Sequence, residues 1–139
     1  MASGIFKRNK VKHLAIEILA RKPTIIALEG PLGAGKTTLT KEIAKQLGVT
    51  EIIVSPTYVL ETEYRIPDTE HLFIHIDCYR METFDELIRL GIEKRITHGD
   101  IIVIEWADKF PDFFKQYPAT NVKISLGKKE NERIINLSQ

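Results

Sequence analysis

The sequence is poor in the features that mark secreted and membrane proteins. It has one cysteine among 139 residues, so it cannot form the internal disulfide bond that is typical of oxidising compartments. No apolar run approaches the length of a membrane span or of a signal-peptide core. These absences predict a cytoplasmic protein without a membrane partner.

The sequence also lacks an excess of charge of one sign. Twenty basic residues against nineteen acidic ones give a formal net charge of +1, which argues against a broad surface for nucleic acid. A basic cluster covers residues 6–12, but Val11, Leu14 and Ile18 recur at helical spacing. This spacing favours a helix with a solvated charged face over a local basic patch.

Metal-ligand patterns are missing as well. The four histidines are His13, His71, His75 and His98, and none has a partner at a spacing that zinc sites use. We therefore expect no zinc.

Against these absences stands one strong motif. Residues 30–37 read Gly-Pro-Leu-Gly-Ala-Gly-Lys-Thr and fit the phosphate-binding pattern G-x-x-x-x-G-K-[ST]. An apolar run, Thr24 to Leu28, supplies the strand that such a loop must follow, and a helical pattern runs on to Gly48. A glycine-rich turn with a solvated lysine is the alternative, and the flanking elements make it the poorer interpretation.

The composition of this loop suits a polyphosphate. Glycines let backbone N–H groups surround the phosphates, and the positive end of the following helix points at them. Lys36 is predicted to reach the β- and γ-phosphates, and the Thr37 hydroxyl to coordinate Mg²⁺. The predicted nucleotide-binding residues are Gly33, Ala34, Gly35, Lys36, Thr37 and Thr38.

The rest of the chain alternates strands and helices, which predicts an α/β fold in a single domain over residues 1–139. We expect a three-layer sandwich with a mostly parallel sheet. Residues 51–54 look like a short strand, and residues 58–64 and 71–79 look like a β-hairpin inserted into the alternation. Segments 120–126 and 132–137 predict antiparallel strands at an edge.

The strand predicted over residues 71–79 has two different faces. Phe73, His75, Asp77 and Tyr79 share the more polar face, whereas Cys78 alternates with apolar residues and is expected to be a core residue. Asp77 is predicted to orient water or Mg²⁺. The alternative is an aspartate that caps the Tyr79-Arg80 backbone.

A second carboxylate ends another predicted strand. Thr83 is a plausible N-cap for a helix that Gly91 bends or ends. After this helix, the apolar run Ile101 to Ile104 leads to Glu105, as in a buried parallel strand. Ligands bind at the carboxyl ends of the strands in α/β sheets. Glu105 is therefore predicted to contact Mg²⁺ or its water shell and to polarise the attacking water, with an exposed acid at a strand end as the alternative.

The combined motifs resemble the TsaE (YjeE) family of small bacterial P-loop ATPases. The resemblance rests on segment 30–38, on Ser-Pro-Thr-Tyr at 55–58, on His-Ile-Asp-Cys-Tyr-Arg at 75–80, on the stretch 86–93 with Leu-Gly-Ile at 90–92 and on Ile-Glu-Trp at 104–106, in the family's order and spacing. It implies a P-loop NTPase fold and an accessory protein for threonylcarbamoyladenosine modification of tRNA. The implied cofactors are ATP and Mg²⁺.

The resemblance also implies partners and residue roles. TsaD and TsaB are the implied partners, with tRNA reached indirectly through their complex. Lys36, Thr57, Asp77 and Glu105 are the implied catalytic residues, with Thr37 and Glu105 at the metal, Thr57 in a switch-like loop and Trp106 beside the site. Pro31 replaces the aspartate that the family often has after the first glycine, which puts any role of that aspartate in doubt.

Other classes of protein fit less well. A small-molecule kinase needs an acceptor-binding subdomain and an arginine-bearing lid, for which the chain has little room. A GTP-dependent switch needs an Asn-Lys-x-Asp guanine reader, and Asn9-Lys10-Val11-Lys12 lacks its aspartate. A nucleotide-binding adaptor that hydrolyses almost nothing alone stays open beside the kinase.

Overall fold

A computed structural model describes residues 2–54 and 60–138 of the chain. Within these ranges, seven strands form one sheet in the order β1-β7-β6-β2-β5-β4-β3. The central strands β4 (Leu72–Asp77), β5 (Ile101–Glu105), β2 (Ile25–Glu29) and β6 (Thr120–Leu126) run parallel. The predicted mostly parallel sheet is confirmed.

Antiparallel strands complete both edges of the sheet. At one edge β3 (Glu61–Arg65) pairs with β4, and Asp68, at φ 63°, lies in the turn that joins them. At the other edge β7 (Glu132–Ser138) pairs with β6, and β1 (Ala2–Lys7) pairs with β7. The predicted hairpin insertion and the predicted antiparallel edge are both confirmed.

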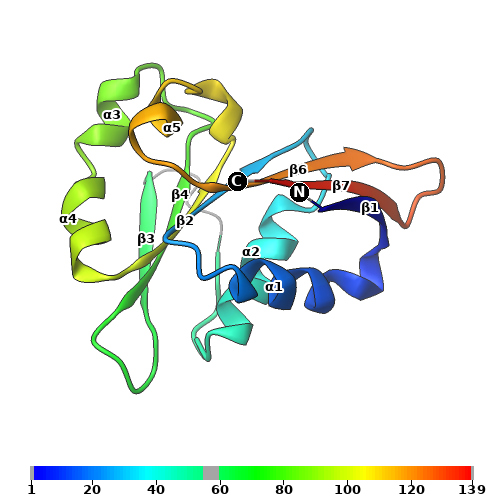
Figure 1. Cartoon of the computed structure of the whole chain (residues 1–139), viewed down its shortest axis with the longest axis horizontal. Coiled ribbons are helices and arrows are strands. Elements are labelled where there is room, and N and C mark those ends of the chain that lie inside the picture. Colours follow the sequence, from blue (N-terminus) through cyan, green and yellow to red (C-terminus); the bar gives the residue numbers. More distant parts are fainter. Residues whose placement is uncertain (1, 55–59, 139) are drawn as a thin grey trace.

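Helices cover the two faces of the sheet, as Figure 1 shows. One face packs against α1 (Val11–Ala20) and α2 (Lys36–Gln46) through an apolar cluster that includes Leu14, Ile18 and Leu39. The other face packs against α3 (Phe84–Ile88), α4 (Ile92–His98) and α5 (Phe113–Gln116), where Phe113 is fully buried. Short 3₁₀ turns lie at Arg8–Lys10 (η1) and Ala107–Lys109 (η2). The chain has the predicted three-layer α/β architecture.

The central strands form where the sequence offers continuous apolar runs. Strands β2 and β5 are buried almost along their whole length, which is the environment of parallel strands covered by helices on both faces. Cys78, just beyond β4, is fully buried beside Ile74 and Ile76, as the alternation predicts. Because β2, β4 and β5 are parallel, their carboxyl ends lie at the same edge of the sheet.

Two features differ from the sequence-based expectations. Residues 51–54 form no strand, since Ile52 is 85% exposed, Val54 is 55% exposed, and the Val54 N–H donates to the Tyr64 hydroxyl instead of to a neighbouring strand. The expectation that Gly91 bends or ends the helix after Thr83 is confirmed, because Gly91 takes a left-handed conformation between α3 and α4. Residues 2–7 form a strand that the sequence analysis missed.

Among the helices that the structure describes, none combines the length and the apolar composition needed to cross a membrane.

Candidate functional site

The phosphate-binding loop lies between the end of β2 and the start of α2, at the carboxyl edge of the sheet. It passes so close to β6 that a Cβ on Gly30 would lie 2.5 Å from the Ile124 carbonyl oxygen, so a side chain at this position would displace the loop. Gly35, at φ 110°, precedes α2, and no side chain caps the first N–H groups of that helix. These uncapped donors and the positive end of the helix dipole suit an anion.

Lys36 is folded back onto its own loop. Its ammonium donates to the carbonyl oxygens of Gly30 at 2.6 Å and Pro31 at 3.0 Å, and lies 4.0 Å from the centre of the Trp106 ring. Burial lowers the pKa of Lys36, and the negative charges of Glu105, Asp108 and Asp77 oppose this effect. A buried ammonium held by neutral groups is ready to exchange them for an anionic partner.

Glu105 is the centre of the site. It is 2% exposed and receives hydrogen bonds from the Thr37 hydroxyl, at 3.2 Å, and the Thr40 hydroxyl, at 3.4 Å. The buried imidazole of His75 also bonds to its carboxylate through Nε2. The structure thus brings Thr37 and Glu105 together, although 68 residues separate them. Hydroxyl and carboxylate oxygens are the donors that Mg²⁺ prefers.

Asp77 ends β4 beside Glu105, with which it is in register across the parallel pair. Its Oδ1 accepts a hydrogen bond from the Tyr79 N–H at 2.8 Å, so Asp77 caps the backbone at this point. A carboxylate that caps the backbone can also orient water or Mg²⁺, so this contact fits both predicted roles of Asp77. Burial raises the pKa of Asp77, the Tyr79 N–H lowers it and the Glu105 charge raises it further. A carboxylate that is costly to ionise is suited to accept a proton.

Trp106 follows Glu105 directly and closes the site from one side. It has a left-handed backbone, at φ 57°, and its ring contacts that of Tyr79 at a centroid distance of 4.9 Å. The ring is therefore in contact with both Tyr79 and the Lys36 ammonium.

The predicted residue Thr57 lies outside the described residues, within 55–59. Its role as a sensor in a switch-like loop stays a prediction. The other predicted residues of the loop, 33–38, lie where the sequence analysis expected them, around the start of α2.

Three contributors to the site were missed in the sequence. The Thr40 hydroxyl shares its one proton between the Lys36 carbonyl oxygen and Glu105, and His75 was noted for its face of the strand but given no role. Arg133 reaches from β7 to the loop, where its Nε donates to the Ala34 carbonyl at 2.9 Å. Thr40 could have been found in the sequence, because it lies one helical turn after Lys36. No sequence signal marks Arg133, whose partner Ala34 is 99 residues away.

The opposite edge of the sheet holds a second polar cluster. His71, His98 and Asp100 lie together there, with one donor atom from each within 4.8 Å of the others. The sequence shows no zinc-type spacing among the histidines, and the fold brings His71 beside His98 and Asp100 although 27 residues separate His71 from His98.

Comparisons with known proteins agree with this geometry. A family model described as threonylcarbamoyl adenosine biosynthesis protein TsaE matches residues 6–135. A protein from Nostoc sp. (strain PCC 7120), named tRNA threonylcarbamoyladenosine biosynthesis protein TsaE, is 38% identical over 88% of this chain and 78% of its own length. A Bacillus subtilis protein of the same name is 42% identical over 63% of this chain and 53% of its own length.

A solved structure gives the same result for the fold. The crystal structure of Bacillus subtilis YdiB superposes with a TM-score of 0.65 and 28% sequence identity, over 98% of this chain and 84% of that one. The fold is that of a P-loop protein. The family match, covering most of the chain, and this superposition together show that the chain belongs to the TsaE family.

Proposed function

We propose that this protein binds and hydrolyses Mg-ATP as an accessory protein in the threonylcarbamoyladenosine modification of tRNA next to the anticodon, acting with TsaD and TsaB. The observation that carries this proposal is the contact of Thr37 with the buried Glu105, beside the uncapped start of α2. Family membership supports the pathway, and tRNA would be reached through the partner complex.

The phosphate-binding residues divide the work by chemistry. Gly33, Ala34 and Gly35 bring backbone N–H groups around the phosphates, and the N–H groups of Thr37 and Thr38 face them from the first turn of α2. The Ala34 N–H donates at present to the Pro31 carbonyl, so the loop must rearrange slightly to use it. Lys36 exchanges the Gly30 and Pro31 carbonyl oxygens for phosphate oxygens.

The residues present fit a magnesium ion. Thr37 and Glu105 supply one hydroxyl and one carboxylate oxygen in contact with each other, and both are hard donors. Thr37 and Glu105 would hold the ion, and the charge that it would supply there would offset the negative charge of the phosphates. His75 and Thr40 hold the Glu105 carboxylate in one orientation, which fixes the direction of its free lone pairs.

Proton handling is assigned to the two neighbouring carboxylates. Asp77, whose pKa is raised by burial, accepts the proton of an attacking water, while Glu105 orients that water or the metal. Thr57 senses the γ-phosphate from the segment 55–59, an assignment that rests on family resemblance. Two alternatives stay open: a small-molecule kinase and an adaptor with negligible intrinsic hydrolysis.

The decisive experiment measures phosphate release from Mg-ATP by the protein alone and with a TsaD–TsaB pair from the same source. We expect stimulation by the pair, none with GTP and none for Lys36→Ala. If phosphate moves instead to a small acceptor, and no complex forms with the pair, the kinase alternative replaces this proposal. If the complex forms without phosphate release, the protein is the adaptor.

The roles within the site separate by variant. Lys36→Ala should lower ATP affinity about 100-fold, because it removes charged hydrogen bonds to phosphate. Asp77→Ala should bind ATP normally and lose turnover. Equal loss of binding in the two variants would remove Asp77 from the catalytic residues, and isothermal titration calorimetry makes the comparison.

A further inference from the structure

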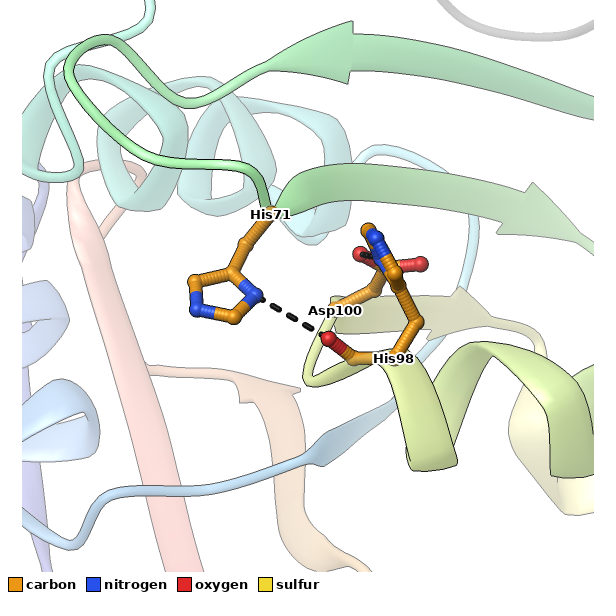
Figure 2. A group of neighbouring side chains, drawn as sticks. All are labelled: His71, His98 and Asp100. Atoms are coloured by element: carbon orange, nitrogen blue, oxygen red, sulfur yellow. Dashed lines mark hydrogen bonds and ion pairs between the residues drawn. The ribbon is translucent and has the colours of Figure 1, made fainter.

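We propose that His71, His98 and Asp100 form a binding site for a divalent transition-metal ion of the zinc class, at the edge of the sheet opposite the phosphate-binding loop. The site is independent of the proposed ATPase activity, and its role is to tie the end of α4 to the start of β4. Figure 2 shows the three side chains, which come from the segment before β4, from the end of α4 and from the residue before β5.

The topology of the sheet creates the cluster. Strands β4 and β5 are parallel neighbours, and Phe73 is in register with Ile101. The residues just before these strands, His71 and Asp100, therefore lie at the same amino edge. His98 is the last residue of α4, so the short turn through Gly99 brings its ring to that edge as well.

Asp100 supplies a fixed carboxylate. It is 3% exposed, and its Oδ1 accepts the Leu72 N–H at 2.8 Å. The same oxygen lies 2.6 Å from Nδ1 of His98, which therefore donates its proton to the carboxylate. A buried carboxylate is costly without a positive partner, and a metal ion in place of the proton would supply one.

His71 presents its Nδ1 atom to the cluster. This nitrogen lies 3.1 Å from the His98 carbonyl oxygen, drawn as a dashed line in Figure 2, whereas Nε2 points away from His98 and Asp100. A carbonyl oxygen only accepts hydrogen bonds, so Nδ1 donates its proton to it. An ion bound at Nδ1 would take the place of that proton, as it would for the proton on Nδ1 of His98.

Gly99 allows the His71 ring to approach. A Cβ at Gly99 would lie 2.8 Å from Cε1 and 2.9 Å from Nδ1 of His71, and the residue has a φ of 90°. The backbone between His98 and Asp100 is thus shaped around the ring of His71. Gly91, at the other end of α4, also has a positive φ but has no atom within 4 Å of its Cβ position.

The dimensions require small side-chain movements. One donor atom from each residue lies within 4.8 Å of the others, whereas two donors on one tetrahedral zinc ion are about 3.4 Å apart. The Asp100 Oδ1 and His98 Nδ1 atoms must therefore separate from 2.6 Å, and His71 must approach them. Both imidazoles are exposed, so they can make these movements without disturbing the core. An open cleft of about 460 Å³, which His98 and Asp100 help to line, leaves room for water as a fourth ligand.

The donor set selects the class of ion. Two imidazoles and one carboxylate suit zinc, cobalt and nickel better than magnesium or calcium, which prefer oxygen donors alone. The lone cysteine does not compete, because burial, followed by the Asp77 charge, raises the pKa of the Cys78 thiol to about 12.

The test is titration of the full-length chain with Zn²⁺, followed by calorimetry, with Co²⁺ absorption as a second probe. We expect one ion per chain, a rise in melting temperature and a Co²⁺ spectrum of low coordination number. The double variant His71→Ala/His98→Ala should bind Zn²⁺ at least about tenfold more weakly and lose the thermal shift. His13→Ala, which changes an exposed histidine on α1, is the matched control and should behave as the wild type.

The two sites of the protein are separated by cross-tests. Lys36→Ala should keep Zn²⁺ binding, and the double histidine variant should keep Mg-ATP binding. Absence of stoichiometric Zn²⁺ binding in the wild type would overturn the proposal and leave the cluster as a hydrogen-bonded end to α4. Binding that survives in the double variant would overturn it as well, by locating the ion elsewhere.

Discussion

At each edge of the sheet beside strands β4 and β5, a buried carboxylate is bonded to a histidine, but the surroundings of the two pairs are very different. At the carboxyl edge, Glu105 contacts the fully buried His75, and hydroxyl groups complete its environment. At the amino edge, Asp100 contacts the exposed His98, and a backbone N–H completes its environment. Both acids are nearly inaccessible, so solvent access to the histidine is what distinguishes the ends.

That difference assigns different tasks to the same pair of residue types. A buried histidine orients its partner and has little freedom to move, which suits an acid that must point in one direction during a reaction. An exposed histidine can turn toward an arriving ion. The carboxyl edge is therefore the edge proposed for chemistry, and the amino edge is the one proposed for metal binding.

The largest expected effect tests whether chemistry is confined to one edge. Glu105→Gln should lower phosphate release about 1000-fold, because the variant cannot orient water or metal with a full negative charge. His98→Ala, at the other edge, should leave the rate unchanged. Steady-state phosphate release in the presence of TsaD and TsaB measures both. A similar loss in both variants would contradict the division between the edges.

The next effect tests the burial of the two histidines. His75→Leu should destabilise the protein by about 3 kcal/mol, because Glu105 loses its buried partner. His98→Leu should cost less than about 1 kcal/mol, since the His98 side chain is 49% exposed. Urea unfolding gives both values.

A chemical rescue sharpens the same comparison. His75→Gln, which retains an N–H donor, should recover part of the stability that His75→Leu loses. If the leucine and glutamine variants are equally unstable, the cost comes from packing around residue 75 and not from the bond to Glu105.

A smaller effect isolates the contact of His71 with the backbone. Gly99→Ala and Gly91→Ala both place a side chain at positive φ, so each should cost about 1 kcal/mol in unfolding free energy. Only Gly99→Ala also collides with the His71 ring, so it alone should weaken Zn²⁺ binding. Calorimetric titration of the two variants side by side checks this, and equal Zn²⁺ affinities would rule out a role for the close approach.

The smallest effect concerns the pH dependence of stability. Burial raises the pKa of Asp77 above its usual value of 3.8, so the folded state holds this proton more tightly than the unfolded state. The stability that protonated Asp77 contributes is therefore fully present below its usual pKa of 3.8, and it is lost as the pH rises through the raised pKa of the folded state. Asp77→Asn should lack this pH dependence and gain at most about 1 kcal/mol at neutral pH. Unfolding curves between pH 4 and 7 test it, and a stability loss at neutral pH would reverse the assignment.

The central sheet and the main acids were predictable because their signals are local. An apolar run closed by Glu105 marks a buried parallel strand, and a glycine loop followed by Lys36 marks the start of a helix. The hairpin around Asp68 was likewise visible as a turn between two alternating segments. Each of these patterns is complete within a few residues.

The parts that escaped prediction depend on distant partners. Strand β1 exists because β7 offers it an edge, and its own sequence resembles the beginning of a basic helix. Residues 51–54 have strand composition, but no neighbouring strand pairs with them in the described part of the chain. The His71 cluster appears only once β4 and β5 are known to be parallel neighbours, since 27 residues separate His71 from His98.

The contact between Lys36 and Trp106 gives the protein an internal optical reporter. Trp106 is the single tryptophan of the chain, and the Lys36 ammonium lies over its ring while the lysine is bound to its own loop. Movement of the ammonium toward a phosphate removes a positive charge from the indole face and shifts its emission. The intrinsic fluorescence of the unlabelled protein then follows the position of one lysine in real time.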